Sequence, residues 1–218
     1  MTKEQLVALR LYTSHSFPAI NNPLRMRHQP YPLPAIVMCM SSGLKRLDAL
    51  DATSDQATAK IEFFRGFTDI QVTDDFKRRG GTEFAPMSTT TDFKVACGYA
   101  VRKGKTNGAL LMKIVTENNK QRGKDMRCFS MFPGEAEALF PPLTFMQPTQ
   151  PYQTASPVNT KLSLARQSFC QLRVLQHRAQ ISAMPNWFEI VFPRFHYPSH
   201  SFCEYVLRAS SHVLRVLL

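Results

Sequence analysis

Two acidic residues, Glu135 and Glu137, lie two positions apart inside the otherwise apolar stretch 132–142. In an extended backbone, residues i and i+2 point to the same face of a strand, about 7 Å apart. Like charges and removal from water both disfavour ionised carboxylates, so such a pair is costly beside apolar neighbours. We therefore interpret the two acids as part of a functional site.

Two further polar motifs precede the acids on segments that the sequence pattern predicts to be strands. The alternation over residues 60–67 puts Arg65 on a mostly apolar strand face, where an arginine requires an anionic partner. The run Ser88-Thr89-Thr90-Thr91 ends a second predicted strand, residues 83–88. Taken singly, each motif has an ordinary interpretation: a structural ion pair, a helix cap and a solvated hairpin with two surface acids.

Together, and in this order, the motifs resemble the signature of the arginine-specific mono-ADP-ribosyltransferases. That signature is an arginine, here Arg65-Gly66, then a Ser-Thr-Ser-like triplet, here Ser88-Thr89-Thr90, then a Glu-x-Glu pair, here Glu135 and Glu137. The third position of the triplet is a threonine, whose hydroxyl keeps the same hydrogen-bonding groups as serine. Residues 9–13 and 20–25 are also similar to the helical start of this family, and the resemblance covers residues 1–148.

The resemblance implies an activity and a role for each motif. Enzymes of this family bind NAD in a cleft, break its nicotinamide–ribose bond and pass ADP-ribose to an acceptor arginine. By that likeness, Arg65 would hold the NAD phosphates and ribose, and the backbone of Gly66 would bind the nicotinamide amide. Ser88, with Thr89 beside it in the NAD-binding motif, would orient Glu137. Glu137 would bind the ribose 2′-hydroxyl and stabilise the developing cation, and Glu135 would engage the acceptor guanidinium.

The chemistry of this reaction suits two carboxylates with different tasks. Nicotinamide is already cationic in NAD and needs no acid to leave, so the barrier is mainly an oxocarbenium-like transition state. A preorganised carboxylate facing that charge lowers the barrier by several kcal/mol. A guanidinium has a pKa above about 12, so a second carboxylate is needed to bind it and take its proton. One acid would give NAD hydrolysis, whereas two give transfer to arginine.

No G-x-G-x-x-G fingerprint is present, which suits NAD as a consumed substrate and not as a bound hydride carrier. We therefore expect no permanently bound cofactor. The five cysteines are irregularly spaced without a Cys-x-x-Cys pair, and the histidines have no ligand spacing, so we expect neither a metal site nor a disulfide framework.

The net charge of +11 favours anionic partners such as nucleotides. We expect NAD and an acceptor protein with an exposed arginine as partners. Two alternatives remain at this point: an NAD glycohydrolase, and a catalytically inactive basic module that contacts nucleic acid or membrane, although no nucleic-acid-binding motif supports the latter. Neither a signal peptide nor an apolar run of about 20 residues is present, so we expect an intracellular, cytoplasmic protein.

Strands joined without regular helical crossovers predict an α+β fold, and the resemblance adds N-terminal helices packed on two small sheets that flank an NAD cleft. A capping box, Thr2-x-x-Gln5, begins the first helix, and Asn21-Asn22-Pro23-Leu24-Arg25 is interpreted as a turn that leads into another short helix. Further predicted elements are an amphipathic helix through Leu44, Leu47 and Leu50, a helix over 92–100 capped by Thr90 or Thr91, and strands at 109–115 and 143–146.

Composition divides the chain near Pro148. All nine glycines lie at or before Gly134, and residues 149–218 carry only two acidic side chains. We expect a catalytic domain over 1–148 and a basic, glycine-free tail over 149–218. Residues 160–180 could form a basic amphipathic helix. For the tail as a whole, a divergent extension, disorder and an incorrectly predicted or frame-shifted translation all remain open.

Overall fold

The computed structural model describes residues 1–51, 59–68, 70, 72–101, 109–151, 153–155 and 167–175. The helices are α1 (Lys3–Tyr12), α2 (Phe17–Arg25), α3 (Pro34–Asp51), α4 (Asp74–Arg79) and α5 (Phe93–Ala100), with 3₁₀ turns η1 (Asn119–Gln121) and η2 (Pro133–Glu135). The strands are β1 (Ile61–Thr68), β2 (Gly81–Glu83), β3 (Met87–Thr90), β4 (Ala109–Thr116), β5 (Lys124–Asp125), β6 (Glu137–Phe140), β7 (Thr144–Pro148), β8 (Gln153–Ala155) and β9 (Gln167–Leu175). The α+β class is confirmed.

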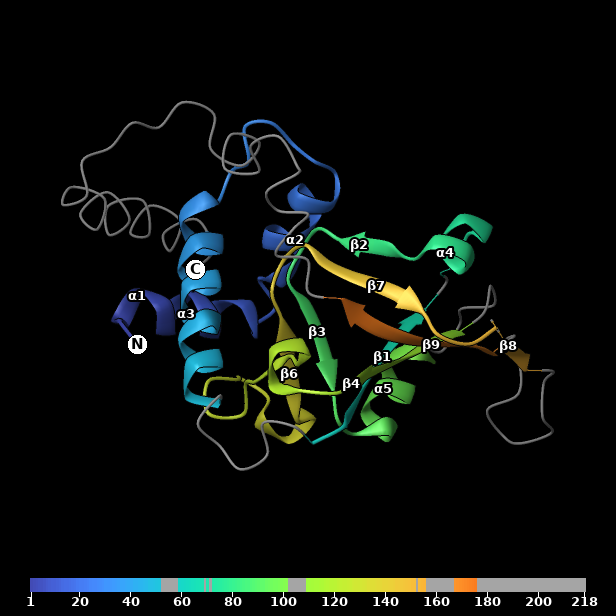
Figure 1. The fold of residues 1–218 in the computed structure, drawn as a ribbon. Coiled ribbons are helices and arrows are strands. Elements are labelled where there is room, and N and C mark those ends of the chain that lie inside the picture. The colour runs from blue at the N-terminus through green and yellow to red at the C-terminus, as the bar shows by residue number, and fades with distance from the viewer. Residues whose placement is uncertain are drawn as a thin grey trace.

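The described strands form two small sheets that meet at one residue pair. The hydrogen-bonded order is β2-β7-β9-β4-β1-β3-β6-β5, with β8 beside β9. β1 and β4 pair along all of Ile61–Thr68, whereas β1 and β3 pair only at Phe64 and Thr90. The smaller sheet is β3-β6-β5, and Figure 1 shows its strands β3 and β6 between the N-terminal helices and the larger sheet. The expected arrangement of helices on two small sheets is therefore confirmed.

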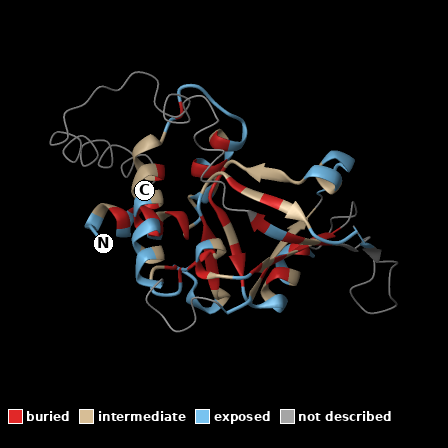
Figure 2. Cartoon of the chain, viewed as in Figure 1, coloured by how far each residue is buried: buried red, intermediate tan, exposed pale blue. Residues whose placement is uncertain are grey.

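Two apolar cores lie on opposite sides of the smaller sheet (Figure 2). One joins the N-terminal helices, through residues such as Leu9 and Met40, to Leu139 of β6. The other fills the space against the larger sheet and includes Phe63 of β1 and Phe140 of β6. Because neighbouring residues of a strand point to opposite faces, β6 contributes to both cores. This double anchoring fixes the strand that begins at Glu137.

The N-terminal capping box is present: the Thr2 side chain accepts from the Gln5 amide, and the Gln5 side chain accepts from the Thr2 amide. The turn expected at Asn21-Asn22-Pro23 is wrong, because these residues lie inside α2. A proline inside a helix removes one backbone hydrogen bond. Burial of Ile20 and Leu24 and a hydrogen bond from Asn21 to Tyr12 offset that loss.

The single strand expected over 83–88 is also wrong. β2 pairs with β7 in the larger sheet, whereas β3 pairs with β6 in the smaller one. Pro86 lies between them, and its carbonyl accepts from the Tyr12 hydroxyl at 2.8 Å instead of joining a ladder. Residues 84–86 therefore carry the chain from one sheet to the other.

The helix after β3 is confirmed, but its expected cap is wrong. Asp92 is the N-cap, and its carboxylate accepts from the Lys94 amide at 2.8 Å. Thr90 is still part of β3, where it pairs with Glu137. Its hydroxyl donates to the Glu135 carbonyl at 2.7 Å and accepts from the Asp92 amide at 2.9 Å, so it holds the turn before the helix, and the cap itself is Asp92.

Residues 167–175 lie beyond the boundary expected near Pro148, and they form β9. This strand runs parallel to β4 and antiparallel to β7, between the two. The helix considered for 160–180 is wrong for these residues, since Cys170, Leu172 and Val174 alternate into the second core with the period of a strand. Residues 176–218 lie outside the described part of the chain.

Candidate active site

Arg65 lies on β1 between two aromatic residues of the second core, Phe63 and Phe67, as the predicted alternation requires. Its guanidinium carbon is 4.8 Å from the centroid of the Phe67 ring. Its Nη1 atom is buried and has no hydrogen-bond partner among the described residues. Burial lowers the pKa of Arg65, while Tyr12 and Glu83 act to raise it. A half-buried cation with one buried, unpaired donor suits an anionic ligand.

Gly66 lets α5 pack directly on β1. A Cβ atom at this position would lie 2.0 Å from the main-chain oxygen of Ala96 and 2.7 Å from the amide nitrogen of Ala100. Beyond Phe64, β1 has a strand partner only on its β4 side among the described residues. The opposite main-chain edge of β1, at Arg65 and Gly66, is therefore open toward the gap between the sheets.

Glu137 is the first residue of β6 and is only 8% exposed. Its carboxylate accepts hydrogen bonds from the hydroxyls of Ser88 and Ser130. Burial raises the pKa of Glu137 above its ordinary value, and the charge of Glu135 raises it further, while the two serine hydroxyls act in the opposite direction. The site thus holds a desolvated carboxylate with a fixed orientation.

Ser130 was not among the residues that the sequence indicated. Its hydroxyl also accepts from the Phe132 amide at 3.0 Å, which ties it to the turn before the acids. A lone serine in a loop carries no pattern of its own. Only the folded turn brings it to Glu137.

Glu135 does not have the extended geometry that the sequence spacing suggested. It ends the 3₁₀ turn η2, and Ala136 adopts the left-handed conformation, with φ of 46°. The backbone therefore turns between the two acids. The Glu135 carboxylate accepts from the Tyr99 hydroxyl of α5 at 2.8 Å, and its carbonyl accepts from the Thr90 hydroxyl at 2.7 Å. The two acids still interact electrostatically, but they are held by different elements.

Thr89 points to the other face of β3. Its buried hydroxyl donates to the Ala138 carbonyl at 2.8 Å and so joins β3 to β6. Alternation puts Ser88 and Thr90 on the face shared with Glu137. The structure therefore gathers Ser88, Glu135 and Glu137, whereas the side chain of Thr89 is engaged within the sheet.

Tyr12 connects the first helix to this site. Its hydroxyl donates to the Pro86 carbonyl and accepts from the Asn21 amide, at 2.8 and 3.1 Å. Burial raises the pKa of Tyr12 to about 12, and both Arg65 and Glu137 are close enough to influence it. The arginine on β1 and the glutamate on β6 thus both lie near one buried hydroxyl.

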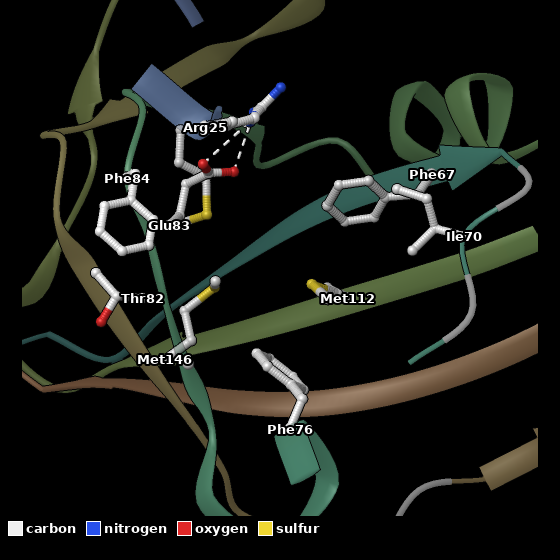
Figure 3. Close-up of a pocket in the computed structure, with 11 residues that line it drawn as sticks. Arg25, Phe67, Ile70, Phe76, Thr82, Glu83, Phe84, Met112 and Met146 are labelled. Atoms are coloured by element: carbon white, nitrogen blue, oxygen red, sulfur yellow. Dashed lines mark hydrogen bonds and ion pairs between the residues drawn. The ribbon is translucent and has the colours of Figure 1, made fainter. Parts of the chain in front are cut away.

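A pocket of about 280 Å³ is lined by residues of the larger sheet and of the segments beside it (Figure 3). Met112, the strand partner of Arg65, lines it together with Phe67. Arg25 and Glu83 form a two-point ion pair at one side, with distances of 3.1 and 3.0 Å. Other lining side chains are Phe76, Phe84, Met87 and Met146. The pocket thus has a mostly apolar wall with the ion-paired guanidinium of Arg25 at one side, a combination found in sites for small ligands.

No group of three His, Cys, Asp or Glu side chains in the described ranges lies close enough to hold a metal ion. Across the same residues, no helix is both long and apolar enough to span a membrane.

Neither a family model nor a curated protein matches this sequence. Solved structures do match. The chain superposes on the ADP-ribosyltransferase HopU1 of Pseudomonas syringae pv. Tomato DC3000 with a TM-score of 0.59 and 19% identity, covering 78% of this chain and 76% of that one. For exoenzyme S of Pseudomonas aeruginosa bound to carba-NAD, the TM-score is 0.54 and the sequence identity is 16%, and the match covers 85% of this chain and 84% of that one. For the ADP-ribosyltransferase Vis in complex with agmatine, the TM-score is 0.57 and the sequence identity is 17%, and the match covers 85% of this chain and 78% of that one.

These likenesses show that the chain has the ADP-ribosyltransferase fold. They agree with the fold that the ordered motifs implied.

Proposed function

We propose that this protein is an NAD-consuming mono-ADP-ribosyltransferase that modifies arginine side chains of an acceptor protein. The observation that carries the proposal is the buried carboxylate of Glu137, oriented by Ser88 and Ser130, with Glu135 at the neighbouring turn. A desolvated, oriented carboxylate beside a second acid suits a reaction that develops positive charge and then accepts a cationic nucleophile.

NAD would bind across the gap between the two sheets. The buried, unpaired Nη1 donor of Arg65 suits the pyrophosphate, since an anion supplies the partner that the described residues lack. The open edge of β1 at Gly66 suits the nicotinamide amide, which needs both a donor and an acceptor. The apolar pocket lined by Phe67 and Met112 suits a flat ring of the nucleotide. The binding of carba-NAD by exoenzyme S, a protein of the same fold, supports this assignment.

Cleavage would break the bond between nicotinamide nitrogen and ribose C1′, and the electron pair would leave with neutral nicotinamide. The ribose then carries the positive charge, and the Glu137 carboxylate stabilises it electrostatically. Hydrogen bonds from Ser88 and Ser130 fix the carboxylate before the charge develops, so little reorganisation is required. Glu137 must be ionised for this task.

Transfer would form a bond between a guanidinium nitrogen of the acceptor and ribose C1′. The nitrogen must lose one proton as it attacks, and Glu135 accepts that proton. Glu135 is less buried than Glu137 and lies on a surface turn, where an acceptor side chain can reach it. The complex of Vis with agmatine, which carries a guanidinium group, supports arginine as the acceptor type.

The test is to incubate the purified protein with NAD and agmatine, and to measure nicotinamide release and ADP-ribosyl-agmatine. We expect both products in equal amounts when agmatine saturates. Release of nicotinamide without labelled agmatine would indicate an NAD glycohydrolase. Absence of nicotinamide release at any NAD concentration would contradict the proposed function.

A further inference from the structure

Helix α5 contacts both halves of the proposed site. Its Tyr99 hydroxyl donates to Glu135 Oε1 at 2.8 Å. The same residue's main-chain oxygen accepts from the Thr68 hydroxyl at 2.8 Å, at the end of β1. Close packing of α5 on Gly66 adds a second attachment to that strand. One helix therefore connects the strand of Arg65 to the carboxylate of Glu135.

The hydrogen bond from Tyr99 restrains a side chain that has little other support. Glu135 lies on a surface turn, and a free glutamate there would sample several rotamers. A single hydroxyl donor occupies one lone pair of one carboxylate oxygen, so the other oxygen remains able to bind a guanidinium. Tyr99 itself is 47% exposed, so its ring does not seal the carboxylate from an incoming side chain.

The restraint applies to only one of the two acids. Glu137 is held by Ser88 and Ser130, from the other side of the turn at Ala136. Loss of the Tyr99 hydroxyl should therefore disturb the position of Glu135 while the hydrogen bonds of Glu137 persist. Bond cleavage and arginine transfer would then respond differently to the same substitution.

From this geometry we propose that Tyr99 is a positioning residue that holds Glu135 ready for the acceptor guanidinium and so favours transfer over hydrolysis. The proposal rests on the proposed function, because it concerns the partition of the same intermediate between arginine and water. It assigns no contact between Tyr99 and the reacting atoms. Its effect passes through Glu135.

The test is Tyr99→Phe in the full chain, with NAD and agmatine as substrates. We expect kcat/KM for agmatine to fall by about 10-fold, since a hydrogen bond to a charged group is lost. The ratio of transfer to hydrolysis should fall by a similar factor. In the background of Glu135→Gln, the same substitution should change that ratio by less than about 2-fold, because the carboxylate that Tyr99 positions is already absent.

Tyr31→Phe is the matched control. Its hydroxyl donates to the Ile20 carbonyl at 3.0 Å in the first core, away from the acids, so its removal should leave the partition ratio unchanged. An unchanged ratio in Tyr99→Phe, with an active wild-type protein, would overturn the inference while leaving the proposed function intact. Equal effects of Tyr99→Phe with and without Glu135→Gln would also overturn it. An inactive wild-type protein would instead refute the proposed function.

Discussion

At the scale of single residues, Glu137 faces conflicting demands. The role proposed for it, stabilising a cation, requires an ionised carboxylate, yet burial raises the pKa of Glu137 above the ordinary 4.5. The rate of nicotinamide release should therefore rise with pH through this raised pKa and then level off. A pH profile of kcat/KM for NAD measures this rise, and a profile already level at pH 4.5 would contradict the assignment.

Glu137→Gln should lower kcat for nicotinamide release by about 100-fold or more at the plateau of that profile.

The same burial predicts a stability change in Glu137→Gln. Because the folded pKa lies above the unfolded one, the folded state holds a proton that the unfolded state has lost, and wild-type stability falls as pH rises through that window. Glutamine does not titrate and avoids this loss. The variant should therefore have the higher Tm at pH 7, and the difference should shrink as pH falls below the unfolded pKa. Thermal melts at both ends of the range measure it, and a lower Tm at pH 7 would argue against burial of a charged carboxylate.

Arg65 gives a further test at this scale. Arg65→Lys keeps the charge but loses the planar guanidinium, which can donate two parallel hydrogen bonds to phosphate. We expect KM for NAD to rise by about 10-fold or more. The exposed Arg127, which pairs only with Asp125 in the described structure, provides the matched control Arg127→Lys. Similar KM values for NAD in the two variants would contradict the assignment of Arg65 to the NAD site.

The sequence could single out Arg65, Ser88 and the two acids as candidates because each motif is local, and their roles stay predictions. Arg65 follows from strand alternation, and the acid pair from its apolar surroundings. Ser130 and Tyr99 could not be predicted, since each reaches its carboxylate only through the folded turn or helix. The spacing of Glu135 and Glu137 was also misleading, because it is the left-handed Ala136 that sets their geometry.

At the scale of elements, the contact between β1 and α5 is a tight one. In Gly66→Ala, the added Cβ would overlap the main-chain oxygen of Ala96, so the helix must shift. We expect a loss of about 3 kcal/mol, or roughly 6 °C or more in Tm, together with loss of transfer to agmatine. Gly98, on the same helix, is the control, because a Cβ there meets no atom within 4 Å. Gly98→Ala should stabilise the protein by about 0.5–1 kcal/mol. Equal effects in the two variants would contradict the close packing.

The type of a helix or strand could be predicted where a sequence pattern was repeated, whereas the residues at which it begins and ends could not. The capping box at Thr2 and the alternation in β1 are repeated local signals. Pro23 and Pro86 were misleading for opposite reasons. Pro23 remains in a helix because burial of its neighbours outweighs a lost hydrogen bond, whereas Pro86 marks a change of sheet that only the pairing partners reveal.

At the scale of the whole molecule, the site depends on two sheets that share a single residue pair. Arg65 belongs to the larger sheet and Glu137 to the smaller one. The relative position of Arg65 and Glu137 is therefore set by the packing of the second core and by Tyr12. The hydrogen bonds between β1 and β3 contribute little, because only one residue pair joins these strands. The order of strands could not be predicted from local pattern, since β9 enters between β7 and β4 from a distant part of the chain.

This position of β9 makes the tail a test of the whole fold. A chain that ends at residue 150 lacks β9, and with it the buried side chains of Cys170, Leu172 and Val174. Their burial is worth on the order of 5 kcal/mol, which is comparable with the total stability of many domains. We expect this truncated chain to show no cooperative thermal transition and no nicotinamide release.

A chain that ends at residue 176 keeps every described element. We expect it to retain the Tm of the full chain within about 3 °C and the rate of nicotinamide release within about 2-fold, because the described site residues all precede β9. Thermal melts and the nicotinamide-release assay on the two truncated chains test whether β9 is required for folding and activity. If the chain ending at 150 folds and acts like the longer one, β9 is dispensable, and the two sheets hold Arg65 and Glu137 together without it.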